Sequence, residues 1–316
     1  MSSPFFFFIL SISTALAIMG CICASAIGKR FGLLDLPDQR KTHRQATPLM
    51  GGLVMVGSFA PLCFVYVLEA FSSRWTPTLI IWLSVVAIVS ILGIIDDRKG
   101  LSPRARLSIT FLVFGAASAI DPTFNVRVLD FLVPAVSLGL GTWWLAIIFT
   151  VVCLVGLLNA VNMADGKNGL VIGLCLGWLG LLATRAPEPL LPVFLLLIGN
   201  CLVLFVFNLR GRLFLGDGGA YGLATAVGLL AIITYNSPGS ETVRSVSADE
   251  LVLLFSVPVI DSFRLTFLRM LRGQSPMAPD RDHLHHIMQS KFGWPLGLML
   301  YYIIALLPSA VVFLNR

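Results

Sequence analysis

The sequence has few charged residues: Asp, Glu, Lys and Arg make up only 12% of its 316 residues. A soluble globular domain carries roughly a quarter. This shortage excludes an ordinary soluble enzyme and an intrinsically disordered chain. Hydrophobic residues reach 57%, and the mean hydropathy is +0.90. These values indicate a polytopic membrane protein, and because little chain is left for a soluble domain we expect a single domain over residues 1–316.

Cysteine is scarce as well. The six cysteines lie inside apolar runs and do not have the spacing of zinc ligands. We therefore expect small core residues rather than a disulfide scaffold or a zinc site. The formal net charge of +6 would suit nucleic acid, but the basic residues are spread over short loops between apolar runs. That distribution is typical of membrane orientation, and we expect no nucleic-acid partner.

Long apolar runs are the dominant feature of the sequence. A bilayer-spanning helix needs about 20 residues, and inside the bilayer only a helix satisfies every backbone group of such a segment. We therefore predict an all-α membrane helix bundle of about ten transmembrane helices, at Pro4–Ile27, Gly51–Glu69, Pro77–Ile95, Leu107–Ile120, Thr142–Val161, Leu170–Thr184, Leu190–Phe207, Ala220–Tyr235, Glu250–Leu268 and Leu296–Leu314.

The positive charges predict the orientation of this bundle. If successive loops alternate between the two sides of the membrane, 17 of the 22 Lys and Arg residues fall on one side. The positive-inside rule assigns that side to the cytoplasm and places both termini outside. All four histidines and the polar motifs described next fall on the same side, so we predict a cytoplasmic active site.

Two adjacent carboxylates, Asp96 and Asp97, follow the third apolar run directly. Neighbouring carboxylates at a membrane surface repel each other and lose hydration, which suits a general base or a magnesium site. The alternative is a solvated helix end whose charge is balanced by Arg98 and Lys99. The pair alone does not decide between the two.

The segment Asn159–Gly169, NAVNMADGKNG, combines amides and a carboxylate at the end of the fifth run. Asn159 and Asn162 share one helix face if the helix continues this far. Asp165 and Gly166 would then end it and offer oxygen ligands and backbone N–H groups to a polar ligand. A helix end capped by Asn and Gly is the alternative, but it does not account for two amides together with a carboxylate.

Asp217 lies in a glycine-rich turn, in the segment RGRLFLGDGGAYG that leads into the eighth run. Glycines let the backbone approach a phosphate closely, and a single carboxylate can hold Mg²⁺ between phosphates. The alternative is a simple helix N-cap, a position at which Asp is common.

A histidine-rich segment, PDRDHLHHIM, contains Arg281, His283, His285 and His286. These side chains suit either a metal or a phosphate. Because no cysteine accompanies them and the other motifs offer oxygen ligands, we favour contact with a phosphate or a sugar. A further basic segment, Gln39–Gly52, is explained well by topology alone.

The Asp-Asp pair, NxxNxxDG, FLGDGG and DRDHLHH occur in this order from one end of the chain to the other. Together they resemble the polyprenyl-phosphate N-acetylhexosamine-1-phosphate transferases, from Thr47 to His286. The DRDHLHH form is more similar to the bacterial enzymes that transfer GlcNAc-1-phosphate to undecaprenyl phosphate, because Leu284 interrupts the three consecutive histidines of the muramoyl-pentapeptide branch. Asn168 departs from the family pattern, which often has Asp there, and an amide cannot act as a carboxylate.

The resemblance implies undecaprenyl phosphate and a UDP-N-acetylhexosamine as substrates and UMP as a product, in the first membrane step of a cell-envelope glycan at the bacterial inner membrane. It implies Mg²⁺, or Mn²⁺ in its place, bound by Asp217 and Asn162. Asp96 or Asp97 would deprotonate or orient the lipid phosphate, and we favour Asp97 as the base. The implied substrate-binding residues are Asn159, Asp165, Asn168, Phe214 (stacked on uracil), Arg106, Arg281, His283, His285 and His286.

Several alternatives stay open at this point. One is that the enzyme is instead a phospho-MurNAc-pentapeptide transferase or another transferase of a UDP-N-acetylhexosamine. The lipid phosphate attacks directly, or an aspartyl-phosphate intermediate forms first. The protein acts as a monomer or as a homodimer. In either case it is surrounded by membrane lipid. The competing functional class is a transporter or lipid flippase, which requires polar residues near the bilayer midplane. Here the polar residues gather at the expected inner helix ends, which favours the transferase.

Overall fold

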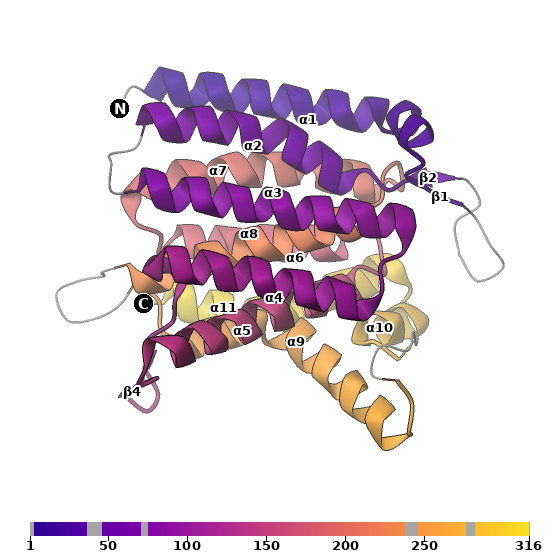
Figure 1. Cartoon of the computed structure of the whole chain (residues 1–316). Coiled ribbons are helices and arrows are strands. Elements are labelled where there is room, and N and C mark those ends of the chain that lie inside the picture. The colour runs from indigo at the N-terminus through magenta and orange to yellow at the C-terminus, as the bar shows by residue number, and fades with distance from the viewer. Residues whose placement is uncertain (1–2, 37–45, 71–74, 238–244, 276–281, 316) are drawn as a thin grey trace. The chain divides into compact units, whose positions relative to one another are not determined.

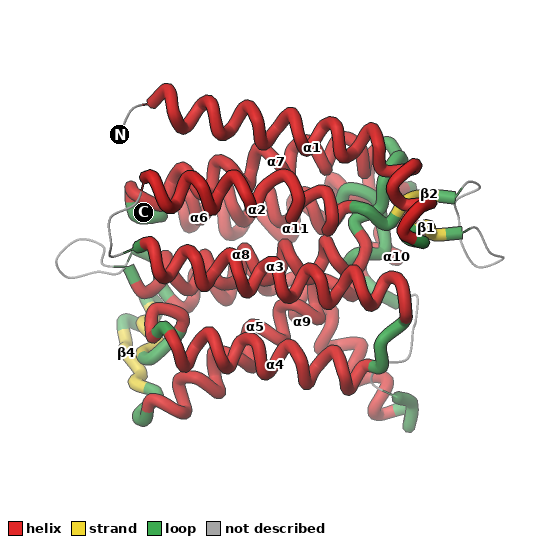
Figure 2. The backbone as a smooth tube through the Cα atoms, turned by 45° about the horizontal axis from the view of Figure 1, so that its top comes forward, coloured by secondary structure: helices red, strands yellow, loops and turns green. Residues whose placement is uncertain are grey.

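The computed structural model describes residues 3–36, 46–70, 75–237, 245–275 and 282–315. Helices account for most of this chain, with two short antiparallel hairpins between them (Figure 2). The chain divides into two compact units. Unit 1 comprises Met1–Ser102 and Glu188–Ala226, and unit 2 comprises Pro103–Pro187 and Val227–Arg316. The single domain expected over residues 1–316 stays a prediction.

Unit 1 is built from long apolar helices. These are α1 (Ser3–Phe31), α2 (Gly51–Ala70), α3 (Thr76–Lys99), α7 (Leu191–Leu209) and the first part of α8 (Gly216–Asn236), with the short strands β1 (Leu34–Asp35) and β2 (Thr47–Pro48) and the 3-10 turn η2 (Glu188–Leu190). Helix α2 packs against α1, α3 and α7, and α1, α2 and α3 lie side by side in Figure 1.

Buried polar side chains link three helices of unit 1. Ser58 of α2 donates a hydrogen bond to Asn200 Oδ1 of α7 at 2.7 Å, and Asn200 Nδ2 donates to Ser13 Oγ of α1 at 2.7 Å. All three side chains are buried, and their polar groups pair with one another. Such interhelical hydrogen bonds suit an apolar surrounding, where water cannot replace them.

Unit 2 contains the remaining elements. These are α4 (Pro103–Ile120), the 3-10 turn η1 (Pro122–Phe124), β3 (Val128–Phe131), β4 (Val136–Gly139), α5 (Trp143–Ala164), α6 (Leu170–Ala183), the rest of α8, α9 (Ala248–Leu271), α10 (Leu284–Phe292) and α11 (Trp294–Leu314). Helix α5 packs against α4 and α9, and α11 packs against α6, α9 and α10. Neither the hairpin β3–β4 nor the short helix α10 was expected from the sequence, because neither carries a long periodic pattern.

All ten apolar runs of the sequence form helices, which confirms a polytopic helix bundle. Within the described residues, however, only eight helices are long and apolar enough to cross a membrane: α1, α2, α3, α5, α7, α8, α9 and α11. Helix α6 has 14 residues, about 21 Å of helix against the roughly 30 Å of a bilayer core. Helix α4 has Arg104 and Arg106 in its first turn, which lowers its hydropathy. The crossing by α4 and α6, and the side on which each terminus lies, stay predictions.

The expectation that the cysteines are core residues is correct for Cys21, Cys63, Cys175 and Cys201, which are buried. It is wrong for Cys23 and Cys153, which are exposed on their helices. An apolar helix surface that faces lipid tolerates such side chains as well as a core does.

Candidate active site

Asp96 lies in the last turn of α3, since this helix continues to Lys99 instead of ending at Ile95 as expected. Its side chain is only 6% exposed. The backbone N–H of Leu101 donates to Oδ1 at 2.7 Å, and the Tyr221 hydroxyl donates to Oδ2 at 3.1 Å. A solvated helix end, the alternative left open by the sequence, therefore does not describe Asp96.

Asp97 holds the beginning of α8. The backbone N–H of Asp217 donates to Asp97 Oδ1 at 2.9 Å, and the N–H of Gly218 donates to Asp97 Oδ2 at 3.0 Å. The first N–H groups of a helix have no partner inside that helix, and a carboxylate there is also favoured by the helix dipole. Asp97 therefore caps α8 from α3, whereas Asp217 lies in the first turn of α8 and is not its cap.

Glycines let α3 and α8 approach each other closely enough for this contact. A Cβ at Gly93 would collide with the backbone of Asp217 and Gly218, and one at Gly52 of α2 would collide with Gly218. Gly216 has a φ of +69°, a conformation that L side chains rarely adopt. The GDGG segment thus places Asp217, which is half-buried, at a fixed position beside the end of α3.

The segment before α8 is paired with the chain before α2. The Phe214 N–H donates to the Pro48 carbonyl at 2.9 Å, and the Gly51 N–H donates to the Phe214 carbonyl at 3.1 Å. Leu49 and Phe214 form a parallel β-bridge. The TPLMGG segment, which the sequence explained by topology alone, therefore holds Phe214, whose side chain is partly exposed.

In unit 2, α5 continues to Ala164, so Asn159 and Asn162 do share a helix face. Asn159 Nδ2 donates to the Val155 carbonyl at 2.7 Å. Asp165 caps the C-terminal end of α5, and its N–H donates to the Asn162 carbonyl at 3.1 Å. All three polar side chains are partly exposed and lie within two turns of the helix end.

The turn that follows, residues 165–169, is fixed by α11. Trp294 Nε1 donates to the Asn168 carbonyl at 3.0 Å, and the Tyr302 hydroxyl donates to the Gly169 carbonyl at 2.7 Å. These contacts engage the backbone of the turn, and Asn168 itself keeps a partly exposed side chain. An amide at this position can donate and accept hydrogen bonds toward a nucleobase edge.

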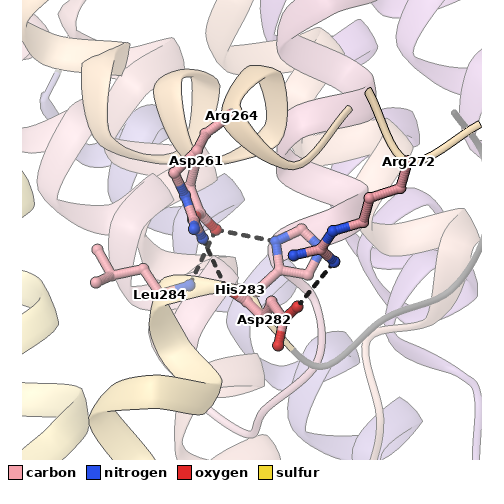
Figure 3. Close-up of polar contacts among 6 residues, drawn as sticks. All are labelled: Asp261, Arg264, Arg272, Asp282, His283 and Leu284. Carbon is pink, nitrogen blue, oxygen red and sulfur yellow. Dashed lines mark hydrogen bonds and ion pairs between the residues drawn. The ribbon is translucent and has the colours of Figure 1, made fainter. Parts of the chain in front are cut away.

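The histidine segment is anchored by a residue that sequence analysis missed. Asp261 of α9 accepts a hydrogen bond from His283 Nδ1 at 2.9 Å, from the Leu284 N–H at 3.1 Å and from Arg264 Nη2 at 2.8 Å (Figure 3). Asp261 is 8% exposed. The signal that could have found it is a carboxylate inside an apolar run, which is costly unless it has partners.

His285 lies over the turn after α5. A Cβ on Gly166 would come within 2.6 Å of His285 Nε2, so this glycine leaves the space that the imidazole fills. The His285 ring stacks on His283 at 5.4 Å and contacts His286 at 4.2 Å between ring centroids. Burial, together with neighbouring His286, His283 and Lys167, lowers the pKa of His285 to about 3. The imidazole is therefore neutral near pH 7.

Two arginines, Arg106 and Arg281, are also expected to bind substrate. Arg106 lies partly exposed in the first turns of α4, in unit 2. Arg281 lies outside the described residues. The structure thus brings Asp96, Asp97 and Asp217 together in unit 1, and it brings the Asp165–Asn168 turn together with His283 and His285 in unit 2.

The donor set for a divalent cation consists of oxygens. Among the described residues, no group of three or more His, Cys, Asp or Glu side chains is arranged to hold a metal ion. Mg²⁺ keeps several waters and is usually bound by one or two carboxylates together with substrate phosphates. The half-buried Asp217 fits that mode, and it does not fit a closed metal site made by protein alone. Asn162, the second expected ligand, lies in unit 2.

Comparison with known proteins agrees with this arrangement of motifs. Residues 79–235 match the family model described as glycosyl transferase family 4. The chain is 29% identical over 310 residues to a probable undecaprenyl-phosphate N-acetylglucosaminyl 1-phosphate transferase of Bacillus subtilis, covering 96% of this chain and 82% of that protein. It is 26% identical to an undecaprenyl-phosphate alpha-N-acetylglucosaminyl 1-phosphate transferase of Yersinia pestis, covering 84% and 72%.

A protein of the same name from Escherichia coli K12 is 25% identical, with coverage of 84% of this chain and 71% of the relative. The matched family region begins in α3 and ends in α8, and it therefore contains the Asp-Asp pair, the turn after α5 and the GDGG segment. The histidine segment follows that region and is covered by the longest of these alignments. Over residues 79–235 the chain is thus similar to glycosyl transferase family 4.

Proposed function

We propose that this protein transfers GlcNAc-1-phosphate from UDP-GlcNAc to undecaprenyl phosphate at the bacterial inner membrane and releases UMP. The observation that carries this proposal is the capping of α8 by Asp97, which holds Asp217 beside the end of α3, where Asp96 and Asp97 lie. The names of the relatives supply the substrate class.

The reaction exchanges one phosphoanhydride bond for another. An oxygen of the lipid phosphate attacks the phosphorus that carries the sugar, the bond from that phosphorus to the bridging oxygen breaks, and UMP leaves with that oxygen. The products are undecaprenyl-diphosphate-GlcNAc and UMP. Two anions must approach each other, so catalysis depends mainly on positioning and on neutralising charge. Bound Mg²⁺ would supply part of that positive charge.

The geometry supports different roles for the three carboxylates. Asp217, held in the first turn of α8, would bind Mg²⁺ together with substrate phosphates. Asp97 would keep Asp217 in place through the two backbone hydrogen bonds, in addition to any contact with the lipid phosphate. Asp96, buried and bonded to Tyr221, would fix the end of α3. Direct attack needs no covalent intermediate on any of them, and we favour it.

In unit 2, the turn after α5 and the histidine segment would bind the UDP-sugar. The Asn168 side chain would contact the uracil edge, and neutral His285 would offer a hydrogen bond without adding charge. Phe214 of unit 1 is the expected stacking partner of uracil. The positive charges of Lys167 and of the basic residues in the histidine segment would attract the negatively charged diphosphate of the UDP-sugar.

UMP release from purified protein tests the proposal. The assay combines undecaprenyl phosphate, Mg²⁺ and a panel of UDP-sugars that includes UDP-GlcNAc, UDP-GalNAc and UDP-MurNAc-pentapeptide. We expect UMP only when both substrates are present, with UDP-GlcNAc the preferred donor. No release from any donor would contradict the transferase. Lipid movement across vesicles without UMP release would instead support a flippase.

The matched variant for this assay is Asp217→Asn, which keeps the size of the side chain and removes the charge. Loss of a charged metal ligand in phosphoryl transfer should reduce turnover by roughly a hundredfold or more. Thermal stability should change little, because the backbone contacts to Asp97 remain. Activity near that of the unaltered protein at saturating Mg²⁺ would remove Asp217 from the metal site.

A further inference from the structure

Asp261 is a buried carboxylate on α9 that receives hydrogen bonds from three different groups. His283 Nδ1 and the Leu284 N–H share Oδ2, at 2.9 and 3.1 Å, and Arg264 donates to Oδ1 at 2.8 Å. Arg264 also donates to the Asp282 carbonyl at 2.6 Å. Figure 3 shows that these contacts tie the chain just before α10 to the side of α9.

The contact with His283 fixes the state of its imidazole. A carboxylate that accepts from a guanidinium and a backbone N–H has only lone pairs to offer, so His283 must carry a hydrogen on Nδ1. The ring plane is then set by Asp261, as a carboxylate sets a neighbouring imidazole in many enzyme sites. His283 is only 7% exposed, which leaves this ring little freedom to turn.

His283 passes this orientation on to His285. Their rings are stacked with an angle of 12° between planes, and His285 is 1% exposed. Among the described residues, His285 Nε2 has no hydrogen-bond partner, although it is buried. It faces Gly166, in the turn that ends α5. A buried nitrogen without a partner is costly, and a ligand in this turn would satisfy it.

A purely structural role would explain part of this arrangement, since Asp261 also receives the N–H at the start of α10. The outer ion pair between Arg272 and Asp282 also links α9 to the chain before α10. Its distance is 3.7 Å and both side chains are more than half exposed, so it contributes little to stability. The structural role does not explain why the chain of contacts from Asp261 ends at a nitrogen aimed at the Gly166 turn.

We infer that Asp261 is a positioning residue for UDP-sugar binding: through His283 it holds His285 over the turn at Gly166. This inference rests on the proposed function and adds a residue that none of the motifs contains. Asp261 itself touches no substrate. Its effect should therefore appear in the affinity for the UDP-sugar and not in the affinity for the lipid phosphate.

The first test is Asp261→Asn. It replaces one carboxylate oxygen, which accepts hydrogen bonds, by an amide NH2 group, which cannot accept them from His283, Leu284 or Arg264. Loss of hydrogen bonds to a charged group should raise the KM for UDP-GlcNAc by roughly tenfold or more. The KM for undecaprenyl phosphate should stay within about twofold, and kcat should fall less than the KM rises. The matched control is Asp249→Asn at the other end of α9, where the carboxylate accepts the Leu132 N–H. This control should leave both KM values unchanged.

A double-mutant cycle tests the route through His283. If Asp261 acts through that ring, Asp261→Asn combined with His283→Ala should be no worse than His283→Ala alone. Independent, multiplying effects of the two changes would overturn the inference. Equal rises in both KM values, accompanied by a lower thermal midpoint, would also overturn it, because they would show a structural role only.

Gly166→Ala keeps the test decisive if Asp261→Asn does not fold. The added methyl group would press on His285 Nε2 without removing any hydrogen bond of Asp261. We expect the same selective rise in the KM for UDP-GlcNAc, and unchanged KM values in this variant would overturn the inference. Absence of UMP release from the unaltered protein would instead refute the proposed function, so the two failures are distinguishable. If the unaltered protein releases no UMP, calorimetry measures the binding of UDP-GlcNAc to the same variants. Weaker binding to Asp261→Asn than to the unaltered protein would support the positioning role, and equal binding would overturn it.

Discussion

At the scale of single residues, Asp96 and Asp97 are neighbours with different surroundings. Asp97 uses both oxygens to accept N–H groups of α8, whereas Asp96 accepts one N–H and one hydroxyl. The sequence favoured Asp97 as the base that takes a proton from the lipid phosphate. The observed contacts favour an orienting role, because the capping bonds are needed whatever the protonation state of the substrate.

The pH profile of Asp97→Asn distinguishes these roles. The second pKa of a phosphate lies near 6, so above about pH 8 the lipid phosphate is largely a dianion and needs no base. If Asp97 orients α8 and Asp217, the variant should lose most activity at every pH from about 6 to 9.5. The measurement is the initial rate of UMP release at saturating substrates. Recovery of activity toward high pH would restore Asp97 as the base.

The low pKa of His285 predicts that the folded protein becomes less stable as the pH falls. Its pKa is about 3 in the folded protein and near 6.5 when unfolded, so between these values the unfolded chain holds more protons. Unfolding is therefore favoured as the pH falls below about 6.5, by about 2 kcal/mol at pH 5. The thermal midpoint in detergent should fall between pH 7 and 5, and His285→Gln should weaken this dependence. Identical pH dependence in both proteins would show that His285 is not the group responsible.

At the scale of secondary-structure elements, the contact between α3 and α8 depends on glycines. A methyl group at Gly93 would collide with the backbone of Asp217 and Gly218, neither of which can move aside as a flexible side chain would. Asp97 then could not reach the first N–H groups of α8. The packing of two helices and the position of Asp217 are thus one property of unit 1.

Gly93→Ala should therefore destabilise the protein by about 1–3 kcal/mol, the usual cost of overpacking. It should also lower UMP release, because Asp217 moves. Gly57→Ala is the control: Gly57 lies in α2 of the same unit with open space around it. Exchange of an exposed helix glycine for alanine should raise stability by up to about 1 kcal/mol. Equal effects of both variants on the thermal midpoint would contradict the proposed close packing.

At the scale of the whole molecule, the proposed function predicts that the polar residues at the helix ends of each unit face the cytoplasm. These residues are Asp97 and Asp217 in unit 1, and the turn after α5 and the histidine segment in unit 2. The two proposed substrates are a water-soluble sugar diphosphate and a lipid whose phosphate lies at the membrane surface, and they would meet at helix ends that reach the cytoplasm. The excess of Lys and Arg in the corresponding loops agrees with that side.

Accessibility of single cysteines tests this topology. In a background without the native cysteines, labels at Arg104, Lys167, Arg212 and Lys291 should react only from the cytoplasmic side. A label at Arg127 should react only from outside. The measurement is the reaction of intact cells and of inverted vesicles with a membrane-impermeant maleimide. Reaction of any of the first four positions from outside would contradict a single cytoplasmic active site.

The helices and the segments that carry the chemistry follow from the sequence. Apolar runs of bilayer length leave the backbone no alternative to a helix, so all ten runs were found at the correct places. The motifs around Asp97, Asp165, Asp217 and His285 stand out because polar groups are costly at the ends of such helices. Helix ends were less accurate, since α3 extends past Asp97 and α8 begins before Asp217.

How these residues act on one another depends on the tertiary structure. Asp97 and Asp217 are 120 residues apart in the chain, and Asp261 and His283 are 22 apart. A hydrogen bond across such a distance depends on which helices pack together and on where glycines let them approach. A local sequence pattern indicates neither the packing partners of a helix nor the glycines that allow close contact. For that reason sequence analysis did not find that Asp97 caps α8 or that Asp261 holds His283. The role of Asp97 as a base stays a prediction that the pH profile tests.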